Sequence, residues 1–210
     1  MAHGAQVIAV ELDQRLIPVL EKKFSRSPNV QIAAGNIFDL RLSDFVADGQ
    51  YLLISSLPFQ ITSLVFRSFL EYAPRPERMA LIVQEEVARR VTAPPGKMSL
   101  LSVSVQYLGY PTYMMTVPRT SFWPAPDVEA AIVRVDVREL PPAAERQAVF
   151  RLARAGFSAR RKMLRNNLEA ALRLPAGTMR DVLTEIGLPA EARAQDVSVH
   201  QWQEMANILL

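Results

Sequence analysis

The sequence predicts an α/β chain, with a mostly parallel sheet and helices on both its faces over residues 1–138. A small all-helical domain over residues 143–210 is expected to follow. Short apolar runs alternate with amphipathic runs up to about residue 136, and only helical patterning remains after Leu140-Pro141-Pro142. Half of the 210 residues are hydrophobic and 21% are charged, a composition typical of folded globular chains.

The strands are predicted from short apolar runs. Residues 7–10 form a continuous apolar run, as expected of a strand that is buried on both faces. Five further strands are expected over residues 30–34, 51–55, 79–83, 112–117 and 130–135. The last two are joined by a proline-rich loop without a long helix, so an antiparallel hairpin is expected at one edge of the sheet.

The helices are predicted from apolar residues that recur with the helical period. Leu16, Ile17, Leu20 and Phe24 give this spacing in the first one. Further helices are expected over residues 61–72, 85–91 and 100–107. In the C-terminal domain, helix breaks are expected at Ser158, at residues 175–177 and 187–189, and at Asp196.

The amino-acid composition excludes several kinds of catalytic and metal sites. The chain has no cysteine, which excludes disulfides, thiolate zinc sites and cysteine nucleophiles. Two histidines, His3 and His200, do not suffice for a histidine-rich metal site and disfavour a Ser-His-Asp triad. No apolar run approaches the roughly 18 residues that span a bilayer, and no signal-type start is present. We therefore expect a cytoplasmic protein without a metal or a membrane anchor.

Charge is concentrated near the C-terminus. The chain carries 24 Lys and Arg against 21 Asp and Glu, and the whole excess lies in its last third. Between Arg151 and Arg173, seven basic residues face a single acid, Glu169. Such a cluster is typical of a surface for a polyanion, although a solvated helix face without a partner gives the same pattern.

Two predicted strands end in polar residues that could contact a nucleotide. Glu11 follows the first strand, where a carboxylate can accept hydrogen bonds from both ribose hydroxyls. Gly35-Asn36 follows the second, where an amide could contact an adenine. The alternatives are that the acidic stretch only caps a helix starting at Gln14, through Asp13, and that Gly35-Asn36 is an ordinary turn.

A third strand ends in Ser55-Ser56-Leu57-Pro58-Phe59. A serine side chain and a backbone carbonyl can accept the two hydrogens of an exocyclic amine, which leaves the nitrogen lone pair available for attack on a methyl group. The aromatic ring can stack on the base. The alternative is a strand-terminating proline turn with a core phenylalanine.

The stretch Ser121-Phe122-Trp123-Pro124-Ala125-Pro126-Asp127-Val128 forms a further motif. Two aromatic residues ahead of Pro-x-Pro predict a stiff, extended loop that can present a ring. The alternative is a loop packed over the sheet edge with Trp123 in the core.

The last motif is Gly156-Phe157-Ser158-Ala159-Arg160-Arg161-Lys162-Met163-Leu164-Arg165-Asn166-Asn167-Leu168. Ser158 is expected to cap a helix whose first turns carry Arg160, Arg161, Lys162 and Arg165. Phosphate contacts are the natural use of these cations.

Together these motifs resemble the small-subunit rRNA adenine N6,N6-dimethyltransferases, the KsgA-type family, which is related to the erythromycin-resistance rRNA methyltransferases. The stretches that carry the resemblance are VIAVELD, the GN turn, SLPF, QEEVARRV with LLSVSVQY, SFWPAPDV and GFSARRKMLRNNL. The resemblance implies a class I methyltransferase (Rossmann-like) sheet, S-adenosylmethionine as methyl donor and two adenines of small-subunit rRNA as targets.

The resemblance also implies residue roles. Glu11 matches the ribose-binding acid and Asn36 the contact to the cofactor adenine, and each is followed by a further expected cofactor contact. Those neighbours are Leu12 and Ile37. Ser56, Leu57, Pro58 and Phe59 match the catalytic target-base motif, with Ser56 also near the cofactor, and Phe122 matches an aromatic that holds the flipped base. The resemblance further implies a monomer that acts on the immature small ribosomal subunit. Its expected rRNA contacts are Arg160, Arg161, Lys162 and Arg165.

The sequence departs from the family pattern at three places. Asn36 stands where the family usually has Asp, and Ser56 where it usually has Asn. The glycine-rich turn and first strand of the family have no counterpart here, so we expect an N-terminally truncated sheet without its central strand. Two hypotheses follow: an rRNA adenine dimethyltransferase, or a non-catalytic relative that binds RNA or the ribosome.

Overall fold

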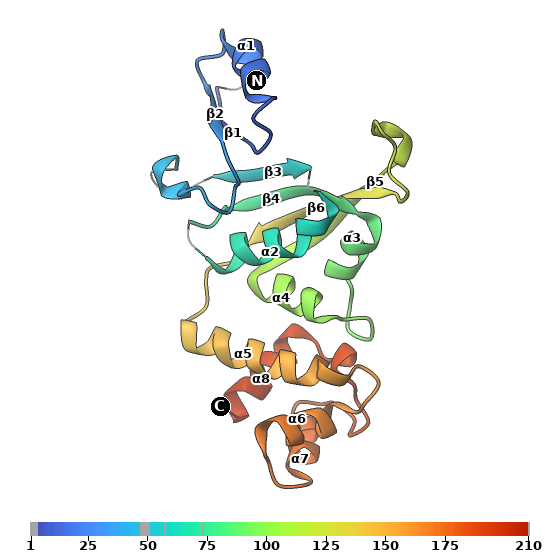
Figure 1. The fold of residues 1–210 in the computed structure, drawn as a ribbon. Coiled ribbons are helices and arrows are strands. Elements are labelled where there is room, and N and C mark those ends of the chain that lie inside the picture. Colours follow the sequence, from blue (N-terminus) through green and yellow to red (C-terminus); the bar gives the residue numbers. More distant parts are fainter. Residues whose placement is uncertain (1–3, 47–50, 57, 73, 210) are drawn as a thin grey trace. The chain divides into compact units, whose positions relative to one another are not determined.

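A computed structural model describes residues 4–46, 51–56, 58–72 and 74–209 (Figure 1). The chain divides into two compact units, Met1–Gln50 and Tyr51–Leu210, and each is described by itself.

The first unit is a parallel strand pair with one helix. Strands β1 (Val7–Glu11) and β2 (Val30–Ala34) pair in register from Val7↔Val30 to Glu11↔Ala34, and helix α1 (Ile17–Phe24) connects them. The short 3-10 turn η1 (Leu42–Asp44) follows. The helix begins at Ile17 rather than at Gln14, and residues 14–16 form turns, so the alternative in which Asp13 caps a helix starting at Gln14 is wrong.

The second unit contains a four-stranded sheet in the order β3-β4-β6-β5. Its strands are β3 (Leu52–Ser56), β4 (Arg78–Gln84), β5 (Gly109–Val117) and β6 (Ala130–Val137). β3 and β4 run parallel, whereas β6 pairs antiparallel with both β4 and β5. The predicted hairpin at the sheet edge is therefore confirmed. β5 begins three residues earlier than predicted and includes Pro111, which an edge strand tolerates.

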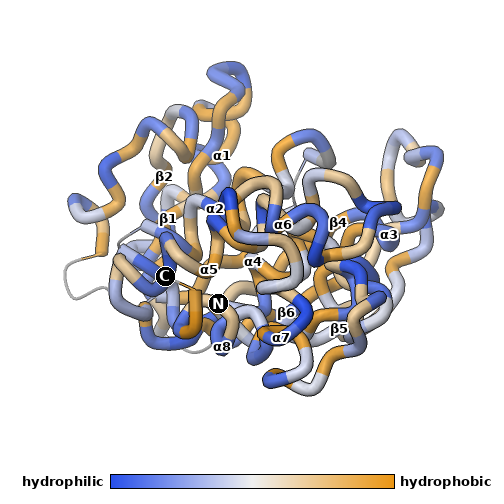
Figure 2. The backbone as a smooth tube through the Cα atoms, turned by 90° about the horizontal axis from the view of Figure 1, so that it is seen from below, coloured by the Kyte–Doolittle hydropathy of each residue, from blue (hydrophilic) through white to orange (hydrophobic). Residues whose placement is uncertain are grey.

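Three helices pack on this sheet: α2 (Thr62–Glu71), α3 (Glu85–Val91) and α4 (Leu100–Leu108). The buried face is made by Met79, Leu81 and Val83 of β4 with Val133 and Val135 of β6. In Figure 2, coloured by hydropathy, orange stretches run through these strands.

The opposite face of the same sheet is partly open within this unit. The side chains of Leu52 and Ile54 on β3 are 58% and 77% exposed. Next to them, Arg78 and Arg134 flank Asp136 in an ion-pair cluster. The sequence predicts helices on both faces, whereas in this unit the helices cover the face of Met79.

The chain ends in four helices: α5 (Ala143–Gly156), α6 (Leu164–Leu172), α7 (Thr178–Glu185) and α8 (Val199–Leu209). They enclose a core with fully buried Leu152, Leu168, Leu183 and Trp202. A Cβ on Gly156 would lie 2.5 Å from Cη2 of Trp202, so only glycine allows this close approach.

These helices also pack on the rest of their unit. The buried Tyr107 of α4 donates to Oε1 of Glu145 on α5 over 3.0 Å, and its ring meets that of Phe150 edge-on at 5.5 Å. The backbone amides of Gly96 and Met98 donate to the carbonyl of Gln195. None of the helices in the described residues is long and apolar enough to cross a membrane.

Candidate functional site

The register of the second sheet brings three of the predicted motifs to one edge. Ser56, the last residue of β3, pairs with Ile82 near the end of β4. Ala130, the first residue of β6, pairs with Gln84 on one side and Val117 on the other. The end of β3, the start of α3 and the loop 118–129 therefore share the edge where parallel strands present their carboxyl ends, the usual ligand site of such sheets.

The SLPF motif forms the turn that leaves β3. Ser56 is exposed, and the carbonyl of Pro58 accepts a hydrogen bond from the amide of Ile61 at 3.1 Å in the 3-10 turn η2 (Phe59–Ile61). Ser56 is therefore an exposed hydroxyl at a strand end, just before this 3-10 turn. Leu57 and the side chain of Phe59 lie outside the described residues.

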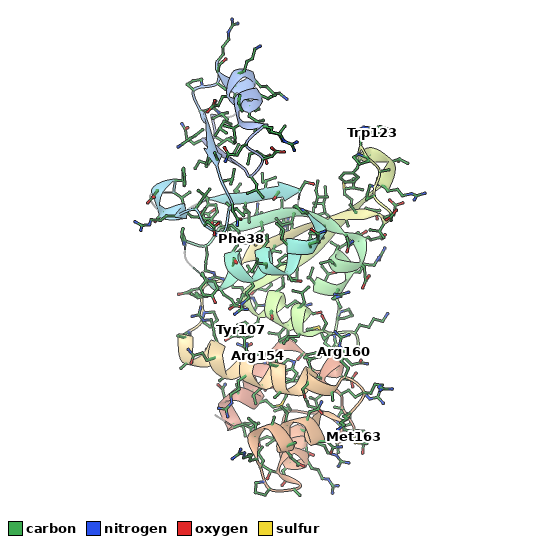
Figure 3. The ribbon with its side chains drawn as sticks, in the orientation of Figure 1. Phe38, Tyr107, Trp123, Arg154, Arg160 and Met163 are labelled. Carbon is green, nitrogen blue, oxygen red and sulfur yellow. The ribbon has the colours of Figure 1, made fainter. Side chains whose placement is uncertain are left out.

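The loop 118–129 is anchored at both ends. The amide of Arg119 donates to Oε2 of Glu129 over 2.6 Å, and the Glu129 carbonyl accepts from the amide of Glu85. Phe122 is half-buried, whereas Trp123 is 97% exposed, as Figure 3 shows at the tip of the loop. The alternative that places Trp123 in the core is wrong.

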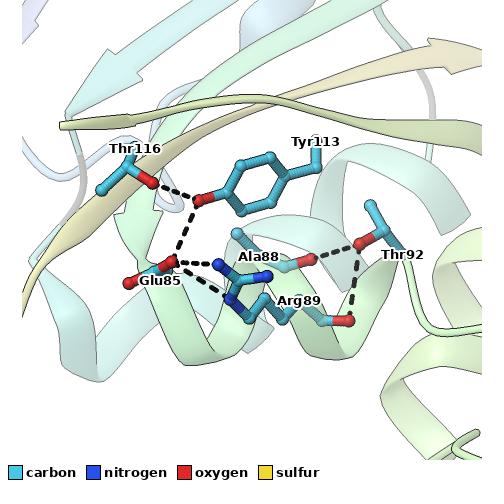
Figure 4. A network of polar contacts seen from close by, with 6 residues as sticks. All are labelled: Glu85, Ala88, Arg89, Thr92, Tyr113 and Thr116. Carbon is cyan, nitrogen blue, oxygen red and sulfur yellow. Dashed lines mark hydrogen bonds and ion pairs between the residues drawn. The ribbon is translucent and has the colours of Figure 1, made fainter.

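A polar network ties β5, the strand that leads into this loop, to α3 (Figure 4). Glu85 accepts hydrogen bonds from Arg89 at 2.5 Å and from the Tyr113 hydroxyl at 3.2 Å, and Tyr113 shares a hydrogen bond with Thr116. The Arg89 guanidinium also lies over the Tyr113 ring. The hydrogen bond from Arg89 lowers the pKa of the Glu85 carboxyl, and the pKa of Arg89 is raised in return.

The sequence analysis missed this network. The pair Glu85 and Arg89 has the spacing of an ordinary helix ion pair, and nothing in the pattern indicates that Tyr113 joins it from 24 residues further along the chain. The network fixes β5 beside its register shift after Tyr113, and so fixes the base of the loop that carries Phe122.

In the first unit, the two predicted cofactor residues lie at one edge of the strand pair. The amide of Gly35 donates to the Glu11 carbonyl at 2.9 Å, and Oε1 of Glu11 accepts from the amide of Asp13 at 2.8 Å. Oδ1 of Asn36 accepts from the amide of Phe38 at 3.2 Å. Glu11, Asn36 and Ile37 are half-buried, and Leu12 is exposed.

This donor set fits a nucleoside. A carboxylate keeps a second oxygen for hydroxyl hydrogens, and an amide offers both a donor and an acceptor. Gly35 takes a φ of 141°, a conformation that favours glycine, in the turn that links the end of β2 to Asn36. Asp13 turns away to Arg15, whose hydrogen bonds lower the pKa of the Asp13 carboxyl.

The C-terminal motif contains both buried residues that pack in the helical core and exposed basic residues. Asn167 is buried, and its Nδ2 donates to the carbonyls of Gly156 at 2.7 Å and Ala159 at 3.1 Å. Leu164 and Leu168 are fully buried on the same helix. The turn before this helix carries three exposed side chains, Arg160, Arg161 and Lys162 (Figure 3 labels Arg160). We call this turn, residues 156–168, the basic turn.

One detail of that motif differs from the prediction. Ser158 does not cap a helix: its hydroxyl donates to the Ala155 carbonyl at 2.7 Å, within the 3-10 turn η4 (Phe157–Ala159). Helix α6 begins only at Leu164, so Arg165 alone of the four expected cations lies on it, half-buried with Nη2 3.4 Å from Sδ of Met163. A serine hydroxyl can donate to a carbonyl of the preceding helix as well as cap the following one, and Ser158 does the former.

The positive charges of the basic turn are not paired with carboxylates in the described part of the chain. Within the described ranges, no carboxylate forms an ion pair with Arg160, Arg161 or Lys162. The same part of the chain contains no group of three or more His, Asp or Glu residues suited to a metal ion.

Comparison with known proteins places the chain. The family model described as ribosomal RNA adenine dimethylase matches residues 1–210. The chain belongs to this family. "Ribosomal RNA small subunit methyltransferase A" of Dehalococcoides mccartyi is 39% identical over 207 residues, which are 96% of this chain and 70% of that relative. The Synechocystis protein of the same name is 34% identical over 224 residues, covering all of this chain and 78% of its own.

Solved structures agree with the adenine dimethylase family. The 23S rRNA methyltransferase ErmE superposes with a TM-score of 0.78 at 26% identity over 97% of this chain and 82% of its own. A dimethyladenosine transferase from Plasmodium falciparum has the same fold, with a TM-score of 0.79 at 21% identity over 95% and 80% of the two chains. These comparisons confirm the resemblance and the class I methyltransferase fold. They also confirm that the chain is an enzyme that methylates rRNA adenines with S-adenosylmethionine as methyl donor.

Proposed function

We propose that this chain transfers methyl groups from S-adenosylmethionine to the N6 amines of adenines in small-subunit rRNA. The observation that carries the proposal is the shared sheet edge of the Ser56 strand end and the Phe122 loop, in a chain that matches the adenine dimethylase family over its whole length. Its relatives named small-subunit methyltransferase A support the choice of substrate. No observation favours the non-catalytic RNA-binding alternative.

The roles at the target base follow from chemistry. The Ser56 hydroxyl and the Leu57 backbone carbonyl would accept the two amine hydrogens, which turns the nitrogen lone pair toward the methyl group. Pro58 restricts the backbone at this point, with φ −55°. S-adenosylmethionine, when bound, supplies an electrophilic methyl group. Because Ser56 and the Leu57 carbonyl would each hold one hydrogen of the attacking nitrogen, Ser56 orients the nucleophile rather than abstracting a distant proton.

Two aromatic side chains would hold the flipped adenine. We assign Phe59 to one face of the base and the half-buried Phe122 to the other. Extruding a base costs a few kcal/mol, and stacking on an aromatic ring returns about 1–3 kcal/mol per base. Two rings therefore suffice to offset the cost of taking the target adenine out of its helix.

The cofactor half lies in the first unit. We assign the ribose hydroxyls to Glu11 and the adenine to Asn36, with Leu12 and Ile37 as apolar neighbours of the cofactor. Asn36 keeps an acceptor oxygen where the family usually has an acid, and it adds an amide donor.

The rRNA-binding role is assigned to the helical segment 143–210, with Arg160, Arg161, Lys162 and Arg165 on phosphates. Exposed guanidinium and ammonium groups without carboxylate partners bind a polyanion without first breaking ion pairs. We further propose that the chain acts as a monomer on the immature small ribosomal subunit, in the cytoplasm.

Phe59→Ala tests the base-holding role. We expect methyl transfer to unmethylated small subunits to fall about 100-fold while the affinity for S-adenosylmethionine, measured by calorimetry, changes less than about 3-fold. Phe59→Tyr is the matched control, since it keeps the ring. Equal losses of transfer and cofactor affinity in Phe59→Ala would mean that Phe59 only supports the fold.

A charge reversal tests the RNA surface. Arg160→Glu with Lys162→Glu should weaken rRNA binding and reduce the slope of log affinity against log salt by about 1.5, the loss expected for two phosphate contacts. Lys22→Glu with Arg26→Glu changes the charge equally at exposed sites outside the motif. Similar slopes for the two double variants would remove the assignment.

A further inference from the structure

Trp123 is the most exposed large apolar side chain in the described part of the chain. Its ring is 97% accessible, whereas Trp202 is completely buried in the helical core. Keeping an indole in water forgoes the burial free energy that such a ring gains elsewhere in the molecule. An exposed tryptophan at a substrate-binding edge therefore indicates a contact that forms only with a partner.

The loop that carries Trp123 is held in place before any partner arrives. The amides of Ser121 and Phe122 donate to the carbonyls of Pro118 and Arg119 at 2.9 and 3.2 Å. The Glu129 side chain closes the loop through the amide of Arg119. Because the backbone is already ordered, contact with a ligand costs little more than fixing the indole rotamer.

Phe122 and Trp123 must serve different partners. Phe122 has extended backbone angles, φ −116° and ψ 151°, so the next side chain points to the opposite side. The burial agrees, since Phe122 is half-buried and Trp123 stands in solvent. One base cannot lie against both rings, but two bases close together in a strand can.

We propose that Trp123 stacks on an unpaired rRNA base adjacent to the target adenine, and not on the target adenine itself. The assignment rests on the proposed rRNA substrate and deepens it, because it makes Trp123 a binding residue for the flanking nucleotide. A flat ring offers a face to any base without hydrogen-bond readout.

The surroundings favour a base over a protein partner. The exposed loop residues around Trp123 are both polar and apolar, and Arg119 is one of them. Within the described residues the Arg119 side chain forms no ion pair, so it can contact a phosphate next to the stacked base.

The test compares Trp123→Ala, Trp123→Leu and Trp123→Phe in the full 210-residue chain, with unmethylated small ribosomal subunits as the probe. We expect Trp123→Ala and Trp123→Leu to raise the KM for subunits about 5- to 150-fold, the range that corresponds to losing one stacked base. Trp123→Phe should restore most of the affinity. The Kd for S-adenosylmethionine should stay unchanged in all three, which separates this contact from the cofactor site.

The matched control is Tyr72→Ala, which removes a 58% exposed aromatic ring at the end of α2, on the opposite edge of the sheet. Its KM should equal that of the wild type. If Trp123→Ala also keeps the wild-type KM while the wild type methylates subunits, the stacking contact is wrong and the proposed function stands. If Trp123→Leu rescues as well as Trp123→Phe, the contact is a generic apolar one, as with a ribosomal protein. If the wild type neither binds nor methylates subunits, both proposals fail.

Discussion

The basic turn and the first unit carry functional side chains on very different scaffolds. In the basic turn, Asn167, Leu164 and Leu168 are buried beneath the exposed cations. In the first unit, Ala33 is the single buried side chain among the described residues, although Glu11 and Asn36 depend on that scaffold for their positions. A parallel strand pair with one helix has little core of its own. The proposed RNA contacts are therefore preorganised, whereas the cofactor contacts rest on a region with little buried apolar surface.

The largest test of this contrast removes one apolar side chain from each region. Leu168→Ala should lower the free energy of unfolding by about 2–5 kcal/mol, because it opens a cavity in a closed core. Leu12→Ala, at a side chain that is 69% exposed, should change it by less than about 0.5 kcal/mol. Urea denaturation followed by circular dichroism gives both values. Equal losses would show that the first unit is as tightly packed as the second.

Ligand binding should act mainly on the weaker scaffold. At a cofactor concentration of 100 times Kd, S-adenosylmethionine should stabilise the bound form by about 2.7 kcal/mol. In hydrogen exchange this protection should appear at the amides of Asp13 and Gly35, which donate to Glu11. Amides of α6 serve as the internal control and should change little. Protection that is uniform along the chain would contradict a cofactor site confined to these strand ends.

The polar half of the basic turn should give a smaller effect. Asn167→Ala leaves the carbonyls of Gly156 and Ala159 without their donor and should cost about 1–3 kcal/mol of stability. It should also weaken rRNA binding although every cation is retained, because the turn loses its brace. Asn166→Ala, at the exposed neighbour, is the matched control. Full rRNA affinity in a folded Asn167→Ala would mean that the cations do not need a fixed turn.

The sequence predicts some of this molecule well, for a physical reason. Apolar runs locate strands because burial is a local requirement, so the strand ends that carry Glu11, Asn36 and Ser56 follow from the pattern. The contrast in packing between the two regions does not follow, since α1 has the same amphipathic spacing as the buried helices yet contains no buried residue. Packing depends on what lies opposite a face, and local spacing does not encode it.

The missed features share a cause as well. The hydrogen bond of Tyr113 to Glu85 and those of Asn167 to Gly156 join residues that only the folded chain brings together. The sequence pattern predicts the wrong helix end for Ser158, because a serine hydroxyl can form hydrogen bonds with backbone groups before or after it in the chain. Trp123 departs from what its residue type predicts. Tryptophan is on average a highly buried residue, but the indole of Trp123 is exposed because of the loop that carries it.

The smallest effect concerns Tyr51, the first residue of the well-packed unit. Its hydroxyl donates to the Pro74 carbonyl at 2.9 Å, and burial raises the pKa of Tyr51 to about 12. In the unfolded chain the phenol ionises near pH 10, so between about pH 10 and 12 unfolding releases a proton and the free energy of unfolding falls. Tyr51→Phe cannot ionise. Its stability deficit at pH 8, from the lost hydrogen bond, should therefore shrink as pH rises through this window.

Urea titrations of both proteins at pH 8, 9, 10 and 11 measure this difference directly. Other groups, including Tyr107, titrate in both proteins and cancel in the comparison. A deficit that stays constant up to pH 11 would mean that Tyr51 ionises equally easily in the folded and unfolded chain. In that case the boundary at which the second unit begins would be open to water, and the tight packing of that unit would start only further along the chain, inside the sheet.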